Sequence, residues 1–134
     1  MIITLHRICE KLPLTFKVNE GLYTTTESLY KFINNAKKNK KKFISLEKYL
    51  TSTKRKDYVS ITFDDGYTDN YLLAYPILKR MKIPFTLYIT TNFIENQSIP
   101  WWFLLEDYLA LKKISKNDYK KENSVYLEKI FKDK

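Results

Sequence analysis

The chain has 134 residues, 44% of them hydrophobic and 16% aromatic, which fits one small globular domain and argues against disorder. Its formal net charge of +9 arises entirely in residues 31–56, where ten lysines and arginines face a single acid, Glu47. Neither a zinc-finger nor an RNA-binding motif accompanies this block. A solvated, lysine-rich surface is therefore favoured over a site for nucleic acid, acidic glycans or lipid head groups.

The sequence contains one cysteine, Cys9, and one histidine, His6. A lone cysteine excludes an intrachain disulfide and a metal site made of cysteines alone, so packing is the expected role of Cys9. No signal-peptide pattern is present, and no apolar stretch is long enough to span a membrane. At face value the sequence predicts a cytoplasmic protein.

A strand and a helix are expected in the first third of the chain. Residues 1–8 are rich in β-branched side chains and predict a short strand, after which a loop follows. Residues 24–39 predict an amphipathic helix, with Thr25 or Thr26 as its N-cap. Its inward-facing positions recur at helical spacing: Leu29, Phe32, Ile33 and Ala36.

The middle of the chain predicts two strands and a helix. Residues 43–50 fit a short strand and then a helical turn capped by Ser45. Residues 59–63 are apolar and β-branched, which is typical of a strand buried on both faces. Residues 69–81 predict a helix, in which Pro76 introduces a kink or begins the regular part.

A further strand and helix follow. Residues 83–91 predict a second buried strand, residues 101–113 an amphipathic helix, and the tail from Ile114 a weakly amphipathic helix. Strands that alternate with helices over connections this long predict an α/β fold with a parallel sheet and right-handed crossovers. In such sheets the chemistry lies just beyond the carboxyl ends of the strands.

A pair of adjacent aspartates, Asp64 and Asp65, lies at such a strand end and is followed by Gly66. Successive residues there point in different directions, so one carboxylate can bind a cation while the other accepts a proton. Metal-assisted hydrolysis is the chemistry that this pattern favours. The alternative is a common turn tripeptide whose carboxylates cap the next helix.

The longer string "ITFDDGYTDNYLLAYPILKRMKIPFTLYITTNFI" resembles the opening of the polysaccharide deacetylase (NodB-homology) domain of carbohydrate esterases. Residues 62–66, "TFDDG", are similar to the first motif of that family. "LHRI" at residues 5–8 and the paired tryptophans in "IPWWFLLEDYL" are similar to further family features. The resemblance extends over about residues 2–112 and is most specific over 59–94.

The resemblance implies the N-terminal half of a distorted (β/α) barrel with parallel strands. Residues 1–112 would form a partial deacetylase domain, and residues 113–134 a lysine-rich, helical tail. The implied reaction is hydrolysis that removes N-acetyl, or less often O-acetyl, groups from an acetylated polysaccharide or oligosaccharide.

The resemblance also assigns roles to individual residues. Asp64 matches the general base of the family, and Asp65 matches the aspartate that binds its divalent metal, usually zinc. His6, Tyr67 and Trp101 are candidates for substrate binding. For Trp101 and its neighbour Trp102, packing is favoured over stacking on a sugar.

The metal site of the family also uses two histidines spaced His-x-x-x-His, and this sequence has no histidine after His6. The metal site is therefore expected to be incomplete, and the chain to be truncated and inactive alone. A non-catalytic glycan-binding or assembly remnant, with a partner chain that completes the barrel, is the alternative. Family members are often found at the cell surface or in the periplasm.

Overall fold

The computed structural model describes residues 1–12, 17–95, 97–98 and 100–111. The chain divides into two compact units. The larger unit consists of residues 1–12 and 20–99, and the smaller one of residues 13–19 and 100–134. The lysine-rich tail from Ile114, for which a helix was predicted, lies outside the described residues.

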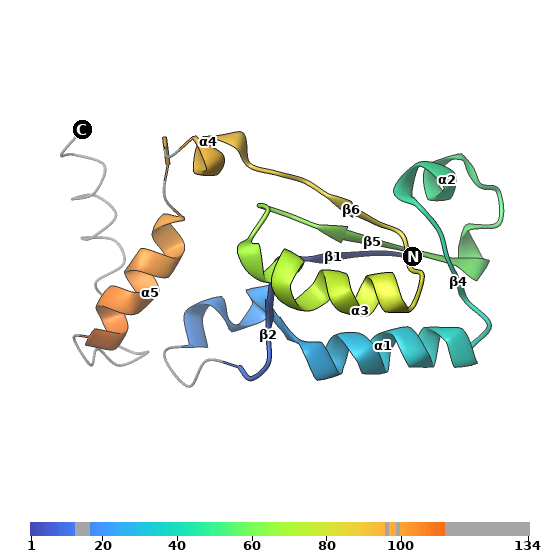
Figure 1. Cartoon of the computed structure of the whole chain (residues 1–134), viewed down its shortest axis with the longest axis horizontal. Helices are drawn as coiled ribbons and strands as arrows, with labels where there is room; N and C mark the ends of the chain where they lie inside the picture. The colour runs from blue at the N-terminus through green and yellow to red at the C-terminus, as the bar shows by residue number, and fades with distance from the viewer. Residues whose placement is uncertain (13–16, 96, 99, 112–134) are drawn as a thin grey trace. The chain divides into compact units, whose positions relative to one another are not determined.

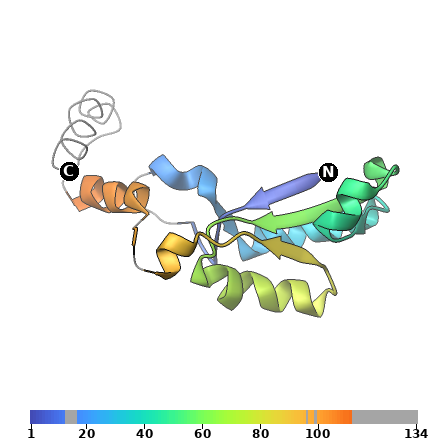
Figure 2. The same ribbon diagram turned by 90° about the horizontal axis from the view of Figure 1, so that it is seen from above.

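Strand β5 (Tyr58–Phe63) is the centre of a four-stranded parallel sheet in the larger unit. Strand β1 (Ile2–Leu5) runs along one edge of β5. Strand β4 (Lys42–Phe43) pairs with the start of β5 and β6 (Phe85–Leu87) with its end. Figure 2 shows β1, β5 and β6 side by side. The predicted parallel α/β fold is confirmed, and the described strands form an open sheet and not a closed barrel.

The hydrophobic core lies on one face of this sheet, because side chains alternate between the faces along each strand. Ile61 and Phe63 of β5 are fully buried on this face. Helices α1 (Thr26–Lys38) and α3 (Tyr75–Arg80) lie on the same side of the strands (Figure 1). The other buried members of the core cluster are Ile8, Leu29, Ile33, Ala74, Leu78 and Ile83.

Two helices begin at the capping residues that the sequence predicted. Thr25 caps α1, since its Oγ1 accepts a hydrogen bond from the Ser28 N–H at 3.0 Å. Ser45 caps α2 (Leu46–Thr51) in the same way and accepts from the Lys48 N–H at 3.4 Å. Both capping residues have extended backbones, as an N-cap requires, so these predictions are confirmed.

The helix predicted over residues 69–81 consists of two parts. A π-helical turn, η3 (Asn70–Ala74), comes first, and α3 follows it directly. Pro76 is the second residue of α3. Its ring has no N–H to donate to the preceding turn, so the regular α-helix begins around it, as predicted.

The prediction of one strand over residues 1–8 is wrong. The chain leaves the four-stranded sheet after β1, and β2 (Arg7–Cys9) pairs with β3 (Tyr23–Thr25) in a separate two-stranded parallel sheet. His6 lies between the two strands. The apolar pattern continues across this break because both strands are partly buried, so the change of pairing partner leaves no mark on the local sequence.

The loop predicted before the first helix contains regular structure. It includes the 3₁₀ helix η1 (Lys17–Leu22) and then β3, which the sequence did not predict because it has only three residues. Cys9 is half-buried, and its thiol lies 3.8 Å from the Thr24 carbonyl oxygen that accepts its hydrogen bond. Burial raises the pKa of the Cys9 thiol most, because it disfavours the charged thiolate. The negative charge of Asp69 raises this pKa further. These contacts agree with a packing role.

The elements around the second buried strand are shorter than predicted. The strand expected over residues 83–91 is reduced to β6, and α4 (Thr91–Ile94) begins immediately after Thr90. A 3₁₀ turn, η2 (Arg55–Asp57), leads into β5.

Helix α5 (Trp101–Leu111) forms most of the described part of the smaller unit and fits the predicted helix over 101–113. The side-chain amide of Asn19 donates to Oε2 of Glu106 at 2.9 Å and to the Trp102 carbonyl at 3.0 Å. Asn19 and Glu106 are both buried. Among the described helices, none combines the length and apolar character that crossing a membrane requires.

Candidate active site

The turn after β5 holds the two aspartates in an unusual backbone conformation. The Asp64 N–H still donates to the Leu5 carbonyl of β1 at 2.9 Å, so the sheet continues to this residue. Asp65 (φ 71°) and Gly66 (φ 73°) are both left-handed. Glycine adopts this conformation freely, and aspartate is among the few other residues that tolerate it. Two left-handed residues in succession turn the chain sharply at the carboxyl end of the strand.

The side chains of the two aspartates turn toward different neighbouring strands. Oδ2 of Asp64 lies 3.8 Å from Nε2 of His6, which directly follows β1. Oδ1 of Asp65 accepts a hydrogen bond from the hydroxyl of Thr90, which follows β6, at 3.3 Å. Because β1 and β6 lie on opposite sides of β5, the carboxylates are directed apart and can serve different functions.

Asp64 and His6 are open to water. Their side chains are 37% and 31% exposed, and at 3.8 Å they form an ion pair only when the imidazole is protonated. The Asp64 carboxylate is thus accessible to solvent and lies next to the His6 imidazole, which is cationic when protonated. A carboxylate that acts as a general base needs this access to the proton that it accepts.

Tyr67, just after the turn, packs against a cation, Arg7. Its ring lies 4.8 Å from the guanidinium carbon of Arg7, a cation–π geometry. Tyr67 also lines a cavity of about 580 Å³ that begins at Gly66. Neither Asp64, Asp65 nor His6 lines this cavity, so it adjoins the turn but is distinct from the carboxylate site.

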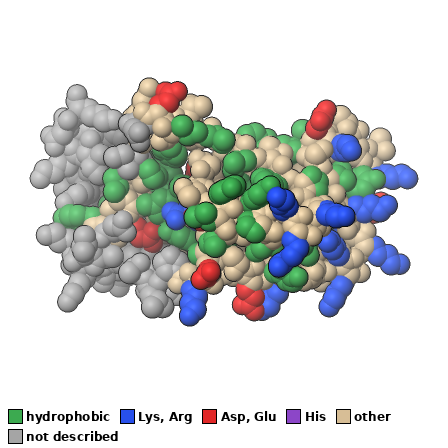
Figure 3. Space-filling model, in the orientation of Figure 1, with side chains coloured by type: hydrophobic (Ala, Val, Ile, Leu, Met, Phe, Trp, Pro, Cys, Tyr) green, Lys and Arg blue, Asp and Glu red, His purple; other side chains and the backbone are tan. Residues whose placement is uncertain are grey.

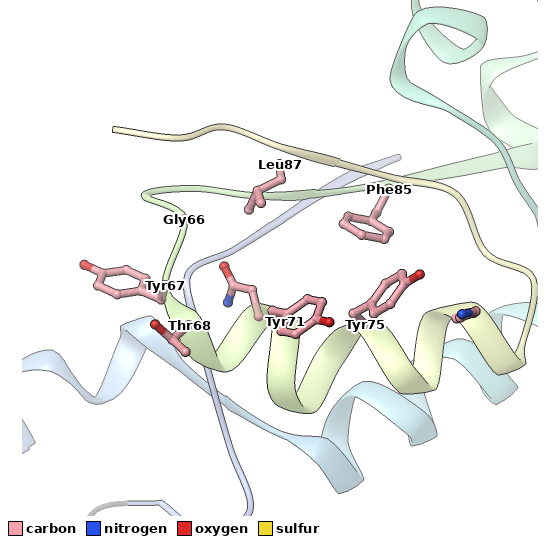
Figure 4. Close-up of a pocket in the computed structure, with 9 residues that line it drawn as sticks. Gly66, Tyr67, Thr68, Tyr71, Tyr75, Phe85 and Leu87 are labelled. Atoms are coloured by element: carbon pink, nitrogen blue, oxygen red, sulfur yellow. The ribbon is translucent and has the colours of Figure 1, made fainter. Parts of the chain in front are cut away.

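Aromatic side chains form much of this cavity (Figure 4). The rings of Tyr71 and Tyr75 are stacked, with centroids 5.7 Å apart. Phe85 and Leu87 of β6 point toward them from the other side. The cavity therefore lies between β6 and the helical segment that follows the turn.

Trp101, the remaining candidate, belongs to the smaller unit. Its side chain is 47% exposed and contacts Trp102 edge to face at 5.8 Å between centroids. In the larger unit, the structure therefore places the His6 ring beside Asp64 and the Thr90 hydroxyl beside Asp65.

Thr90, Asp69 and Asn70 were not singled out from the sequence. Thr90 was missed because the strand was predicted to extend over residues 83–91, whereas β6 ends at Leu87 and leaves Thr90 beyond its carboxyl end, at the same edge of the sheet as Asp65. Asp69 and Asn70 are polar residues in a segment predicted to be helical, where they look like ordinary surface positions. Their contacts with the chain around His6 depend on residues more than sixty positions away.

The described residues do not by themselves form a zinc site. Zinc in proteins normally takes at least three protein ligands. Within the described ranges, no three His, Cys, Asp or Glu side chains lie close enough together to hold a metal ion. His6, Asp64 and Asp65 thus fall short of the donor set that such a metal needs.

Comparison with known proteins identifies the family of the segment that contains this turn. Residues 51–124, more than half of the chain, match the polysaccharide deacetylase family. A stretch of 31 residues is 58% identical to the putative polysaccharide deacetylase YxkH of Bacillus subtilis (strain 168), and covers 23% of this chain and 11% of that protein.

A solved structure has the same fold. It is that of a de-N-acetylase from Aggregatibacter actinomycetemcomitans, with a TM-score of 0.60 and 22% sequence identity. The similarity covers 74% of this chain and 41% of that one, so the chain corresponds to less than half the length of this relative. The chain belongs to the polysaccharide deacetylase family.

Proposed function

We propose that this chain takes part in removing acetyl groups from a sugar polymer, with Asp64 as the general base. The family typically acts on polysaccharides and depends on a metal. The observation that carries the proposal is the divergence of the two carboxylates at the end of β5. Asp64 faces His6 and water, whereas Asp65 is held by Thr90.

The proposed reaction is hydrolysis of an acetamido group. Asp64 accepts a proton from the attacking water as its oxygen bonds to the acetyl carbon. The C–N bond then breaks, the nitrogen takes up a proton, and acetate and a free amine leave. For an O-acetyl group the C–O bond breaks instead and an alcohol is released.

We propose further roles for the other candidates. Asp65 contributes one oxygen ligand to the divalent metal, with zinc as the expected ion, although the described residues do not bring a full set of three ligands together. His6, next to Asp64, contacts the sugar near the reacting group. Tyr67 and Trp101 contribute aromatic rings to binding of the sugar polymer.

We also propose that residues 1–112 are the N-terminal half of a distorted (β/α) barrel, which a partner chain can complete. The parallel strands and the helices on one face of the sheet support this proposal. On the opposite face, Thr62 donates to Thr4 at 3.1 Å across neighbouring strands. A polar inner face is what a barrel with a catalytic interior needs.

The substitution Asp64→Asn tests the proposed base. The substitution is made in a longer protein that contains this chain and releases acetate from acetylated chitooligosaccharides. We expect its kcat to fall by ~10²–10⁴-fold relative to the unsubstituted protein, because the amide cannot accept the proton. We expect the 134-residue chain alone, with added zinc, to release no more acetate than this variant. Matching circular dichroism spectra would show that the variant is folded.

Two outcomes would contradict these expectations. Full turnover by a folded Asp64→Asn variant would exclude Asp64 as the base. Turnover by the 134-residue chain alone, lost on the same substitution, would show that it is a complete catalyst.

A further inference from the structure

We infer that Asp69 and Asn70 are positioning residues that hold His6 beside Asp64. The relevance of this inference to catalysis rests on the proposed function, in which Asp64 is the general base. The geometric part of the inference does not, because it concerns contacts within this chain alone.

Asn70 binds the backbone of His6 directly. Its side-chain amide donates one hydrogen bond to the His6 carbonyl at 2.7 Å and another to Oδ1 of Asp69 at 3.0 Å. The Asn70 residue is only 5% exposed. Both amide hydrogens are therefore used, in a place where water does not compete for them.

Asp69 binds the two residues that follow His6. Its Oδ1 accepts a hydrogen bond from the Ile8 N–H at 2.9 Å. Its Oδ2 forms an ion pair with Nε of Arg7. The Asp69 side chain is 14% exposed, so this pair is largely shielded from solvent. Asp69 and Asn70 together thus contact three consecutive residues: the carbonyl of His6, the side chain of Arg7 and the amide of Ile8.

These contacts occur where the strand ladder changes. β1 pairs with β5 as far as Leu5, and β2 pairs with β3 from Arg7 onward, so His6 belongs to neither ladder. The side chains of Asn70, the first residue of the π-helical turn, and of Asp69, its N-cap, fix the backbone there in place of strand pairing. A fixed backbone at His6 restricts where its ring can lie, and the ring then meets Asp64 at 3.8 Å.

The arrangement connects the two ends of one short segment. In "DDGYTDN", residues 64–70, the first aspartate faces the His6 ring. The last residue, Asn70, binds the His6 carbonyl, and Asp69 before it binds the two residues that follow His6. The same turn thus supplies the proposed base and the support for its neighbour.

NMR spectroscopy of the 134-residue chain tests this inference without any substrate. His6 is the sole histidine, so its ring protons are assigned without ambiguity. In the parent protein at a single pH, we expect cross-relaxation between the His6 ring and the Asp64 side chain, and slow hydrogen exchange at the Ile8 amide. The absence of both would overturn the inference at once.

Asn70→Asp is the most direct variant, because it keeps the shape of the side chain but replaces both donors by a carboxylate. We expect the cross-peaks between His6 and Asp64 to be lost, and the Ile8 amide to exchange about tenfold faster. Asn35→Asp makes the same chemical change on the exposed surface of α1 and should alter neither signal.

Asp69→Asn is a milder second variant, in case Asn70→Asp does not fold. It keeps an acceptor for the Ile8 amide but removes the ion pair with Arg7. We expect the cross-peaks between His6 and Asp64 to weaken rather than disappear, and the exchange of the Ile8 amide to increase by less than in Asn70→Asp. Folded variants whose His6 and Ile8 signals match the parent protein would refute the positioning role.

The two proposals can fail separately. If the NMR changes occur but acetate release does not depend on Asp64, the positioning role stands and the proposed function fails. If acetate release depends on Asp64 but the His6 ring is unmoved by both variants, the reverse holds.

Discussion

Gly66 is the residue whose replacement most directly tests the turn beside the aspartates. Its backbone is left-handed, and a Cβ built there lies 3.4 Å from both Cγ1 and Cγ2 of Ile89. The added methyl group would thus be in ordinary van der Waals contact with Ile89, so the unfavourable backbone conformation is the main cost of Gly66→Ala. The left-handed conformation costs a non-glycine residue ~1–2 kcal/mol.

We expect Gly66→Ala to lower the free energy of unfolding by ~1–2 kcal/mol, measured by urea denaturation. Gly21→Ala is the matched control, because no atom lies within 4 Å of its added Cβ and its φ is not positive. Equal stability of the two variants would show that the left-handed turn is not maintained in solution.

At the scale of single elements, α1 shows how local sequence and packing combine. Thr25 Oγ1 accepts from the Ser28 N–H and donates to the Ser28 hydroxyl at 2.8 Å. On the apolar side of α1, Leu29, Ile33 and Ala36 are buried. The cap sets where the helix begins, and the buried side sets which face meets the sheet.

Replacing the cap tests its contribution. We expect Thr25→Ala to lower the free energy of unfolding by ~1 kcal/mol, since an N–H in the first turn loses its partner. Thr26→Ala, one position further along, should change it by less than about 0.5 kcal/mol. Thermal or urea denaturation of the two variants measures the difference, and a larger loss in Thr26→Ala would mean that the cap is misassigned.

In the larger unit as a whole, basic side chains are concentrated near the amino ends of the strands. Helices α1 and α3 end near each other there, and Nζ of Lys37 donates to the Met81 carbonyl at 3.4 Å. Lys40 and Lys82, just after these helices, both have left-handed backbones. Figure 3 shows Lys and Arg side chains gathered at this end. The basic residues from the two segments are Lys37, Lys38, Lys40, Lys41, Lys42, Lys79, Arg80 and Lys82.

Repulsion among these charges should make stability depend on salt. We expect the free energy of unfolding to rise as NaCl increases from ~0.02 to ~0.3 M, because the screening length falls below ~10 Å. Replacing the exposed Lys38 and Lys42 of this group by Gln should reduce this rise. Urea denaturation at each salt concentration measures it, and a free energy that falls with salt would contradict the explanation.

Much of this protein could be predicted from local sequence. The caps at Thr25 and Ser45, the central strand and the Pro76 boundary depend on residues close together in the chain, where backbone preferences act directly. The family and the turn with Asp64 and Asp65 were also recognisable, since "TFDDG" is a contiguous motif.

Contacts between distant segments were decided only by the tertiary structure. The break at His6, the pairing of β2 with β3, and the contacts of Asp69 and Asn70 join residues far apart in the chain. Such contacts form only when packing brings the segments together, so no local pattern announces them. The sequence alone thus determined that two aspartates end a buried strand, and the fold decided that one faces His6 and the other Thr90.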